Sequence, residues 1–98
     1  MVRKLQKADI DRVADIWLDT NLKAHDFISA QYWKRNFKLV KEMLLQAEVY
    51  VYESDQKIQG FIGLNNDYIE GIFVSDKMQS QGIGKILLND TKDKRNEL

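Results

Sequence analysis

The sequence predicts a mixed α/β domain in which a mainly antiparallel sheet is flanked by helices. Apolar residues recur at steps of three and four in the first half of the chain, which is the spacing of amphipathic helices. β-Branched and aromatic runs replace this pattern from Glu48 onward, and helical spacing returns after Gly82. The predicted order is strand, helix, helix, strand, strand, strand, helix. Because the three consecutive strands are joined by short turns, antiparallel pairing is favoured, with the helices packed on the sheet.

The composition indicates one small globular domain over residues 1–98. Fifteen basic residues balance fifteen acidic ones, so the chain lacks the basic footprint of a nucleic-acid-binding protein. The absence of cysteine excludes thiolate metal sites, and His25 alone cannot form a histidine cluster, so no metal is expected. No apolar run approaches the ~20 residues of a membrane span, and no secretory signal begins the chain. We therefore predict a cytoplasmic protein without a membrane partner.

The first half of the chain is predicted to contain one short strand and two helices. Residues 2–5 form the strand, and Asp9 is a candidate N-cap for the first helix. A loop is expected over residues 21–28, followed by Ser29 as the N-cap of a second helix that ends near Gln46. The apolar stripes of the two helices are Ile10, Val13 and Trp17, and then Trp33, Phe37, Val40 and Leu44.

Three strands joined by tight turns are expected next, over residues 49–52, 58–64 and 68–74. The turns are rich in Ser, Asn and Asp, which favour such geometry. Gly60 and Gly63 interrupt the middle strand, and glycine there indicates close packing against a neighbour or a β-bulge.

The segment from Ile72 to Lys85 carries the most chemical information. An apolar strand leads through a polar loop into a helix whose first turn holds Gly82 and Gly84. Helix amino ends present unpaired N–H groups and partial positive charge, and glycine lets an anion approach them, so a pyrophosphate cradle is one interpretation. A plain strand–helix turn is the other. The dinucleotide and P-loop fingerprints are excluded, because Leu87 stands where a third glycine is needed and Ile86 follows Lys85.

The run Gln79-Ser80-Gln81-Gly82-Ile83-Gly84 resembles the GNAT N-acetyltransferase pattern Gln/Arg-x-x-Gly-x-Gly/Ala. The element order over the whole chain is similar to that family as well. The resemblance implies acetyl-CoA as cosubstrate and an amine as acceptor. It also implies that main-chain groups of Ile72, Phe73 and Val74 bind the pantetheine arm. The pyrophosphate would be held by backbone N–H groups of Gln79, Ser80, Gln81, Gly82, Ile83, Gly84 and Lys85. Residues 78–81 depart from the commoner loop, which carries basic side chains.

GNAT domains generally continue beyond the phosphate-binding helix with a strand, a helix and two further strands. The resemblance therefore implies that these 98 residues form the N-terminal, acetyl-CoA-binding portion of such a domain, truncated at its C-terminal side. A tyrosine general acid often comes from the later portion, so we expect little or no turnover from this chain. The strand over residues 68–74 would lack its outer neighbour, and we expect a homodimer through that edge.

Glu70 is the candidate general base, because strand alternation predicts that it shares a face with Ile72 and Val74. A solvated strand-end carboxylate is the alternative. Tyr50, Tyr52 and Tyr68 either shape an acceptor pocket or pack against the sheet. Three functions stay open: an acetyl-CoA-dependent N-acetyltransferase, a non-catalytic CoA-binding or oligomerising module, and an unrelated small α+β protein.

Overall fold

The computed structural model describes residues 1–66 and 68–94, so the predicted turn residue Asp67 and the last four positions lie outside the described residues. Within that range the sheet has four antiparallel strands in the order β1-β2-β3-β4. The predicted α/β fold and element order are confirmed, except that the second predicted helix is divided into two. The elements are β1 (Val2–Lys4), α1 (Ile10–Ala24), α2 (Ala30–Arg35), α3 (Phe37–Gln46), β2 (Glu48–Ser54), β3 (Lys57–Asn65), β4 (Tyr68–Val74) and α4 (Ile83–Lys94).

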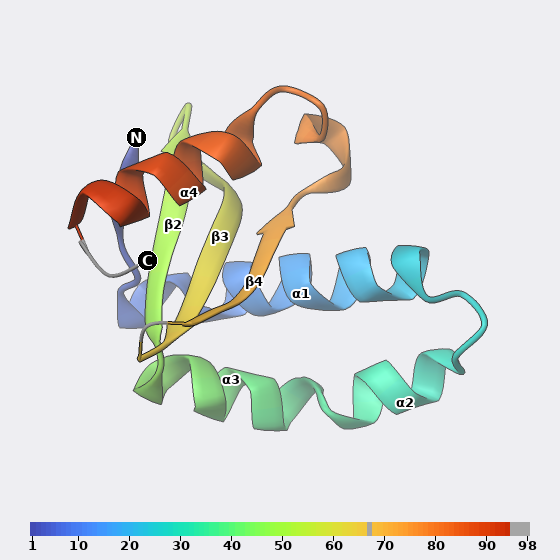
Figure 1. The fold of residues 1–98 in the computed structure, drawn as a ribbon. Coiled ribbons are helices and arrows are strands. Elements are labelled where there is room, and N and C mark those ends of the chain that lie inside the picture. The colour runs from blue at the N-terminus through green and yellow to red at the C-terminus, as the bar shows by residue number, and fades with distance from the viewer. Residues whose placement is uncertain (67, 95–98) are drawn as a thin grey trace.

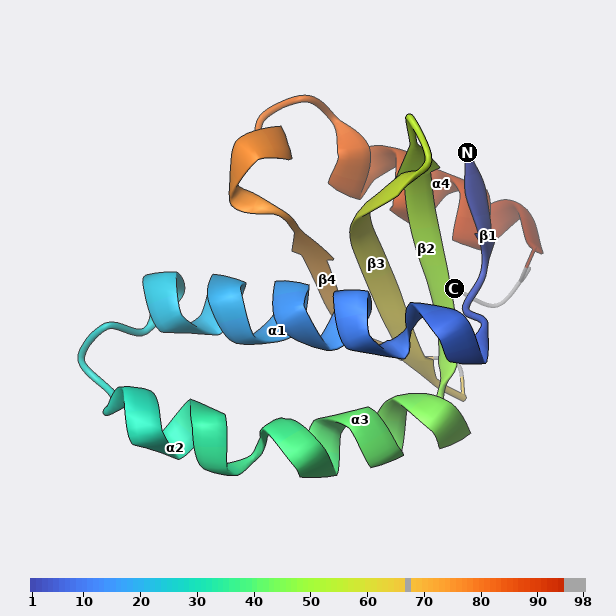
Figure 2. The same ribbon diagram turned by 180° about the vertical axis from the view of Figure 1, so that it is seen from behind.

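The sheet lies between α4 on one face and α1 with α3 on the other (Figures 1 and 2), and an apolar core fills each side. On one face α1 and α3 pack against β2 and β3, and this core includes Val13, Ile16, Leu44, Val51 and Phe61. On the opposite face α4 packs against the same strands, and that core consists of Ile62, Leu64, Ile83 and Leu87. Because neighbouring side chains of a strand point to opposite faces, Phe61 and Ile62 are buried in different cores. The apolar contacts between α4 and the sheet therefore fix the position of α4 relative to β4.

Two helix boundaries differ from the predicted ones. α1 continues to Ala24, into the expected loop, because the Asn21 carbonyl still accepts from the His25 N–H at 3.0 Å. The second helix is divided at Asn36, whose side-chain Nδ2 donates to the Tyr32 carbonyl at 2.8 Å. Asparagine competes with helical hydrogen bonding in this way, which explains the break. The predicted cap at Ser29 is confirmed, since its Oγ accepts from the Gln31 N–H.

Asp9 does not cap α1 with its side chain, so that prediction is wrong. Its Oδ2 instead accepts from the Gln6 N–H at 2.8 Å, and the carboxylate is bound by the Arg3 guanidinium at 2.7 and 3.1 Å. Arg3 Nε also donates to Glu53 Oε1 at 2.7 Å. Asp9 is only 9% exposed, so losing this partner would leave a nearly buried charge. The network ties β1 to β2 and to the start of α1.

We expect Arg3→Met to lower the free energy of unfolding by about 2 kcal/mol at pH 7. Hydrogen bonding from Arg3 lowers the pKa of Asp9, so the stability that Asp9 contributes is present above its unfolded pKa of ~4. That contribution is lost as pH falls through the lower folded value. The difference in unfolding free energy between wild type and Arg3→Met should therefore shrink below about pH 4. Urea unfolding at pH 7 and at pH 3 measures this change. An equal difference at both pH values would assign the loss to packing.

None of the helices in the described ranges combines the length and apolar character that crossing a membrane requires.

Candidate functional site

The outer edge of β4 presents main-chain groups that no other described strand pairs with. β4 pairs with β3 on one side, with Phe73 opposite Phe61 and Ile72 opposite Ile62, and no strand among the described residues pairs on its other side. The Ser75 N–H donates to the Gln59 carbonyl at 2.8 Å. Because hydrogen-bonded positions alternate along an antiparallel strand, Phe73 also bonds toward β3, whereas Ile72 and Val74 direct their N–H and C=O groups outward. Ile72 and Val74 can therefore make the main-chain contacts with a ligand that were predicted for them. The main chain of Phe73 faces β3, so only its side chain can contact such a ligand.

The loop after β4 turns sharply into the amino end of α4. Ser80 and Gly82 both adopt positive φ, +68° and +79°. The first helical hydrogen bond runs from the Ile86 N–H to the Gly82 carbonyl at 3.0 Å. The N–H groups of residues 83–85 therefore have no acceptor within the helix and point out of its amino end. That end of the helix carries a partial positive charge. This geometry suits an anion held by main-chain donors.

The two glycines of this turn have different roles. A Cβ on Gly82 would meet no protein atom within 4 Å, so that space is open, but its φ of +79° disfavours an L side chain. A Cβ on Gly84 would lie 3.6 Å from Ile72 Cγ2, an ordinary contact, and would point at the sheet. Gly82 serves the shape of the turn, whereas Gly84 faces β4. Ile83 is 3% exposed and buried in the α4 core, so only its amide remains for a ligand.

A hollow of about 240 Å³ lies beside the edge of β4 at the end nearest this turn. It brings together four of the predicted cofactor residues with the carboxyl-terminal half of α1. Lys23 on α1 pairs with Asp76, in the segment that follows β4, at 3.2 Å and with Asp19 at 3.2 Å, which links α1 to that segment. The hollow is lined by Thr20, Asn21, Ala24, His25, Ile72, Phe73, Val74 and Gln79. Ser80, Gln81, Gly82 and Lys85 are exposed beyond it, on the turn and the start of α4.

Glu70 lies on the face opposite the one that strand alternation predicts. The β3–β4 register shifts here, since Ile69 pairs with Leu64 and Gly71 with Gly63, and Glu70 is the extra residue between them. Such a β-bulge re-aims the side chain. Ile72 and Val74 lie under Gly84 on the α4 side, whereas Glu70 lines a pocket on the α1–α3 side. The predicted shared face is therefore wrong.

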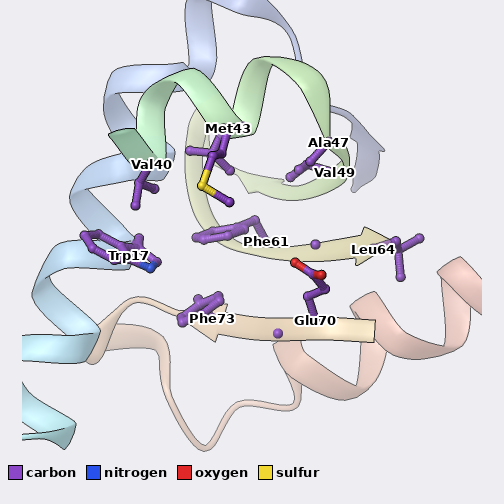
Figure 3. A pocket seen from close by; sticks show the side chains of 12 residues that line it. Trp17, Val40, Met43, Ala47, Val49, Phe61, Leu64, Glu70 and Phe73 are labelled. Carbon is purple, nitrogen blue, oxygen red and sulfur yellow. The ribbon is translucent and has the colours of Figure 1, made fainter. Parts of the chain in front are cut away.

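That pocket has a volume of about 250 Å³ and largely apolar walls (Figure 3). Glu70 and Phe73 extend into it from β4, Phe61 from β3 and Trp17 from α1, with Met43 and Val40 above them from α3. The Phe61 and Phe73 rings stack with centroids 4.9 Å apart. The Phe73 ring also covers Gly71, where a Cβ would lie 2.6 Å from it. Asn65 Nδ2 donates to Glu70 Oε1 at 3.0 Å and orients the carboxylate.

The aromatic residues around this pocket are not those predicted for an acceptor site. Tyr50 and Tyr52 pack against the α4 core, and Tyr68 is exposed. Trp17 packs against the α1–α3 core, as its place in the apolar stripe predicts, and it also borders this pocket. Phe61 and Phe73 were not predicted as pocket walls. The sequence did carry one sign of this arrangement, namely Gly71, which stands two residues before Phe73 on the same strand and leaves room for its ring. His25 stacks on Trp33 with centroids 5.6 Å apart and borders the smaller hollow. Across residues 1–66 and 68–94, no group of three or more His, Asp or Glu side chains is placed to hold a metal ion.

An open strand edge runs into the amides at the start of α4, an arrangement that suits an extended ligand with an anionic group. Residues 14–98 match the family model described as acetyltransferase (GNAT) domain. The chain belongs to the GNAT acetyltransferase family.

Relatives and solved structures agree with this assignment. Peptidyl-lysine N-acetyltransferase YiaC of Escherichia coli is 32% identical over 90 residues, which cover 90% of this chain and 62% of YiaC. Peptidyl-lysine N-acetyltransferase YjaB of Salmonella typhimurium is 28% identical, over 89% of this chain and 61% of its own. The chain thus spans about three fifths of the length of these relatives.

Among solved structures, apo YjaB of E. coli superposes with a TM-score of 0.85 at 23% identity, covering all of this chain and 67% of YjaB. The PaiA N-acetyltransferase of Thermoplasma acidophilum in complex with coenzyme A gives a TM-score of 0.84 at 19% identity, covering all of this chain and 74% of PaiA. At these identities the likeness shows the fold.

Proposed function

We propose that this chain carries the acetyl-CoA-binding portion of an N-acetyltransferase that acts on an amine. The observation that carries the proposal is the continuity between the outward main-chain groups of Ile72 and Val74 and the free amides at the start of α4. An extended amide-containing arm fits the first, and a pyrophosphate fits the second. The GNAT fold and the coenzyme A complex of PaiA support acetyl-CoA as the cosubstrate.

The proposed chemistry divides the site between the two faces of the sheet. The cradle lies at the α4 end of β4, and Glu70 projects toward the α1–α3 face. The amine would approach from the Glu70 side, so that the carboxylate accepts its proton before attack. The C–N bond then forms and the C–S bond of the thioester breaks, and the departing thiolate takes up the proton that the attacking nitrogen loses as the amide forms. The names of YiaC and YjaB support a lysine side chain as the first acceptor to test.

Isothermal calorimetry with coenzyme A tests the binding half of the proposal, and release of free thiol from acetyl-CoA with a lysine peptide tests the catalytic half. We expect coenzyme A to bind in the calorimetry and thiol to be released slowly from acetyl-CoA in the turnover assay. Binding without any thiol release would support a non-catalytic CoA-binding module instead. No binding at all would remove both functions. The single-domain organisation, the cytoplasmic location and the lack of nucleic-acid, membrane and metal partners stay predictions.

Glu70→Gln should lower turnover about 100-fold, because it keeps the shape of the side chain and removes its ability to accept a proton. Affinity for coenzyme A should be unchanged, since Glu70 faces away from α4. Glu42→Gln, at an exposed position of α3, is the matched control and should match wild type. Wild-type turnover by Glu70→Gln would show that the base is another group or ordered water.

We further propose that the free edge of β4 lets two copies of the chain pair as a homodimer. Ile69 and Ile72 are 38% and 36% exposed along this strand, and exposed apolar edges recruit other strands. The same outward groups are those proposed to bind the cofactor arm. Light scattering across a dilution series should therefore show a dimer that dissociates when coenzyme A is added. A monomer at high micromolar concentration contradicts the idea.

A further inference from the structure

The outward carbonyl of Val74 is already occupied. Gln79 Nε2 donates a hydrogen bond to it at 3.2 Å, folding the side chain back from the loop onto the end of β4. Both residues line the hollow of about 240 Å³ beside the strand edge. A primary amide on a short aliphatic stem therefore stands where the proposed function, on which this inference rests, places an amide of the pantetheine arm.

The polar side chains of the α1 wall do not compete for this carbonyl. Thr20 Oγ1 donates to the Ile16 carbonyl at 2.8 Å, and Asn21 Nδ2 donates to the Trp17 carbonyl at 2.8 Å, so both are turned back onto their own helix. Gln79 is the side chain that reaches across from the loop. Its position is fixed locally, because its own N–H bonds weakly to the Asp76 carbonyl at 3.5 Å and Ser80 follows with a positive φ.

We propose that the Gln79 side chain is a placeholder for the cofactor arm, and that it must be displaced from its place against the Val74 carbonyl before the arm can bind. Gln79 is exposed, and a neutral hydrogen bond to an exposed group contributes little net free energy, so the contact is readily exchanged. The contact lowers the affinity of any ligand that uses the edge of β4 and leaves unaffected a ligand that uses only the helix amides.

The alternative role for the same contact is structural. If Gln79 mainly holds the loop in place, its removal would loosen the pyrophosphate cradle and weaken every ligand that uses the cradle. When the Gln79 donor is removed, the placeholder role predicts tighter binding of a ligand that carries the arm, and the structural role predicts weaker binding. Comparing one ligand with the arm and one without it therefore separates the two roles.

Gln79→Met keeps the length of the side chain and removes the donor. Calorimetry would compare coenzyme A with adenosine 3′-phosphate 5′-diphosphate, which carries the pyrophosphate without the arm. We expect Gln79→Met to bind coenzyme A roughly two- to tenfold more tightly than wild type does, and the arm-free nucleotide equally well. Gln31→Met, at an exposed position on α2, is the control for added apolar surface and should match wild type with both ligands.

Equal or weaker binding of coenzyme A by Gln79→Met would overturn the placeholder role, and weaker binding of both ligands would establish the structural one. Gln79→Ala provides a second variant without a side-chain donor and should shift in the same direction. If wild type and both variants fail to bind either ligand, the cofactor site itself is wrong and the inference falls with it. Binding by wild type with no change in the variants would overturn the inference alone.

Discussion

Gly60→Val should destabilise the domain by about 3 kcal/mol or more, which corresponds to a fall in melting temperature of roughly 12 °C or more. Gly60 lies on β3 beneath α4. A Cβ there would lie 2.9 Å from the Phe73 carbonyl oxygen, 3.3 Å from Ile83 Cγ2 and 3.5 Å from Leu87 Cδ1. Neither the backbone of β4 nor the buried side chains of α4 can move aside cheaply. The strand pair and α4 must therefore separate.

Gly63→Ala is the matched control for this prediction. Gly63 lies on the same strand, three residues on, and a Cβ there would meet no protein atom within 4 Å. Its melting temperature should stay within about 4 °C of the wild-type value, because the change adds one methyl group to open space. Melting followed by circular dichroism compares the two variants. Equal melting temperatures for Gly60→Val and Gly63→Ala would show that α4 does not press on β3 as described.

Gly82→Val should weaken binding of coenzyme A by about 100-fold or more. Valine is strained at a φ of +79°, so the turn must change and carry the first amides of α4 with it. Hydrogen bonds to a charged pyrophosphate contribute about 1.5–3 kcal/mol each, and loss of two of them gives this magnitude. Calorimetry with coenzyme A measures the effect directly. Wild-type affinity in this variant would remove the turn from the site.

Gly82→Asn separates backbone strain from obstruction by the added side chain. Asparagine adopts positive φ far more readily than valine, so the turn should keep its shape. We expect Gly82→Asn to bind coenzyme A within about tenfold of wild type. If Gly82→Asn lost as much affinity for coenzyme A as Gly82→Val does, the effect would be assigned to the added side chain. That side chain would occupy the space that is open beside Gly82.

Most of the architecture could be predicted from the sequence, because its signals are local. Helical spacing from Ile10 to Leu44 and β-branched runs from Val49 to Val74 each fix an element without reference to the rest of the fold. The Gln79–Gly84 pattern located the strand–turn–helix unit for the same reason. Gly60 and Gly63 were interpreted as close packing or a bulge, and the structure has both, the first at Gly60 and the second beside Gly63.

The features that the sequence did not predict depend on pairing between distant segments. The bulge that turns Glu70 toward the α1–α3 face arises from the register of β4 against β3, which alternation along one strand cannot reveal. Asp9 has the spacing of an N-cap, but Arg3, folded beside it by the β1–β2 pairing, binds the carboxylate instead. The Gln79 contact with Val74 likewise requires the loop to fold back on the strand.

Amide chemical shifts in a coenzyme A titration test the central claim most directly, namely that the edge of β4 and the amino end of α4 form one cofactor site. We expect the largest shifts at the amides of residues 79–85, together with those of Ile72 and Val74. The amides around Arg3 on β1 and Glu53 on β2, on the side of the sheet away from β4, should not move. Shifts centred on any other surface, or none at saturating coenzyme A, would contradict the account.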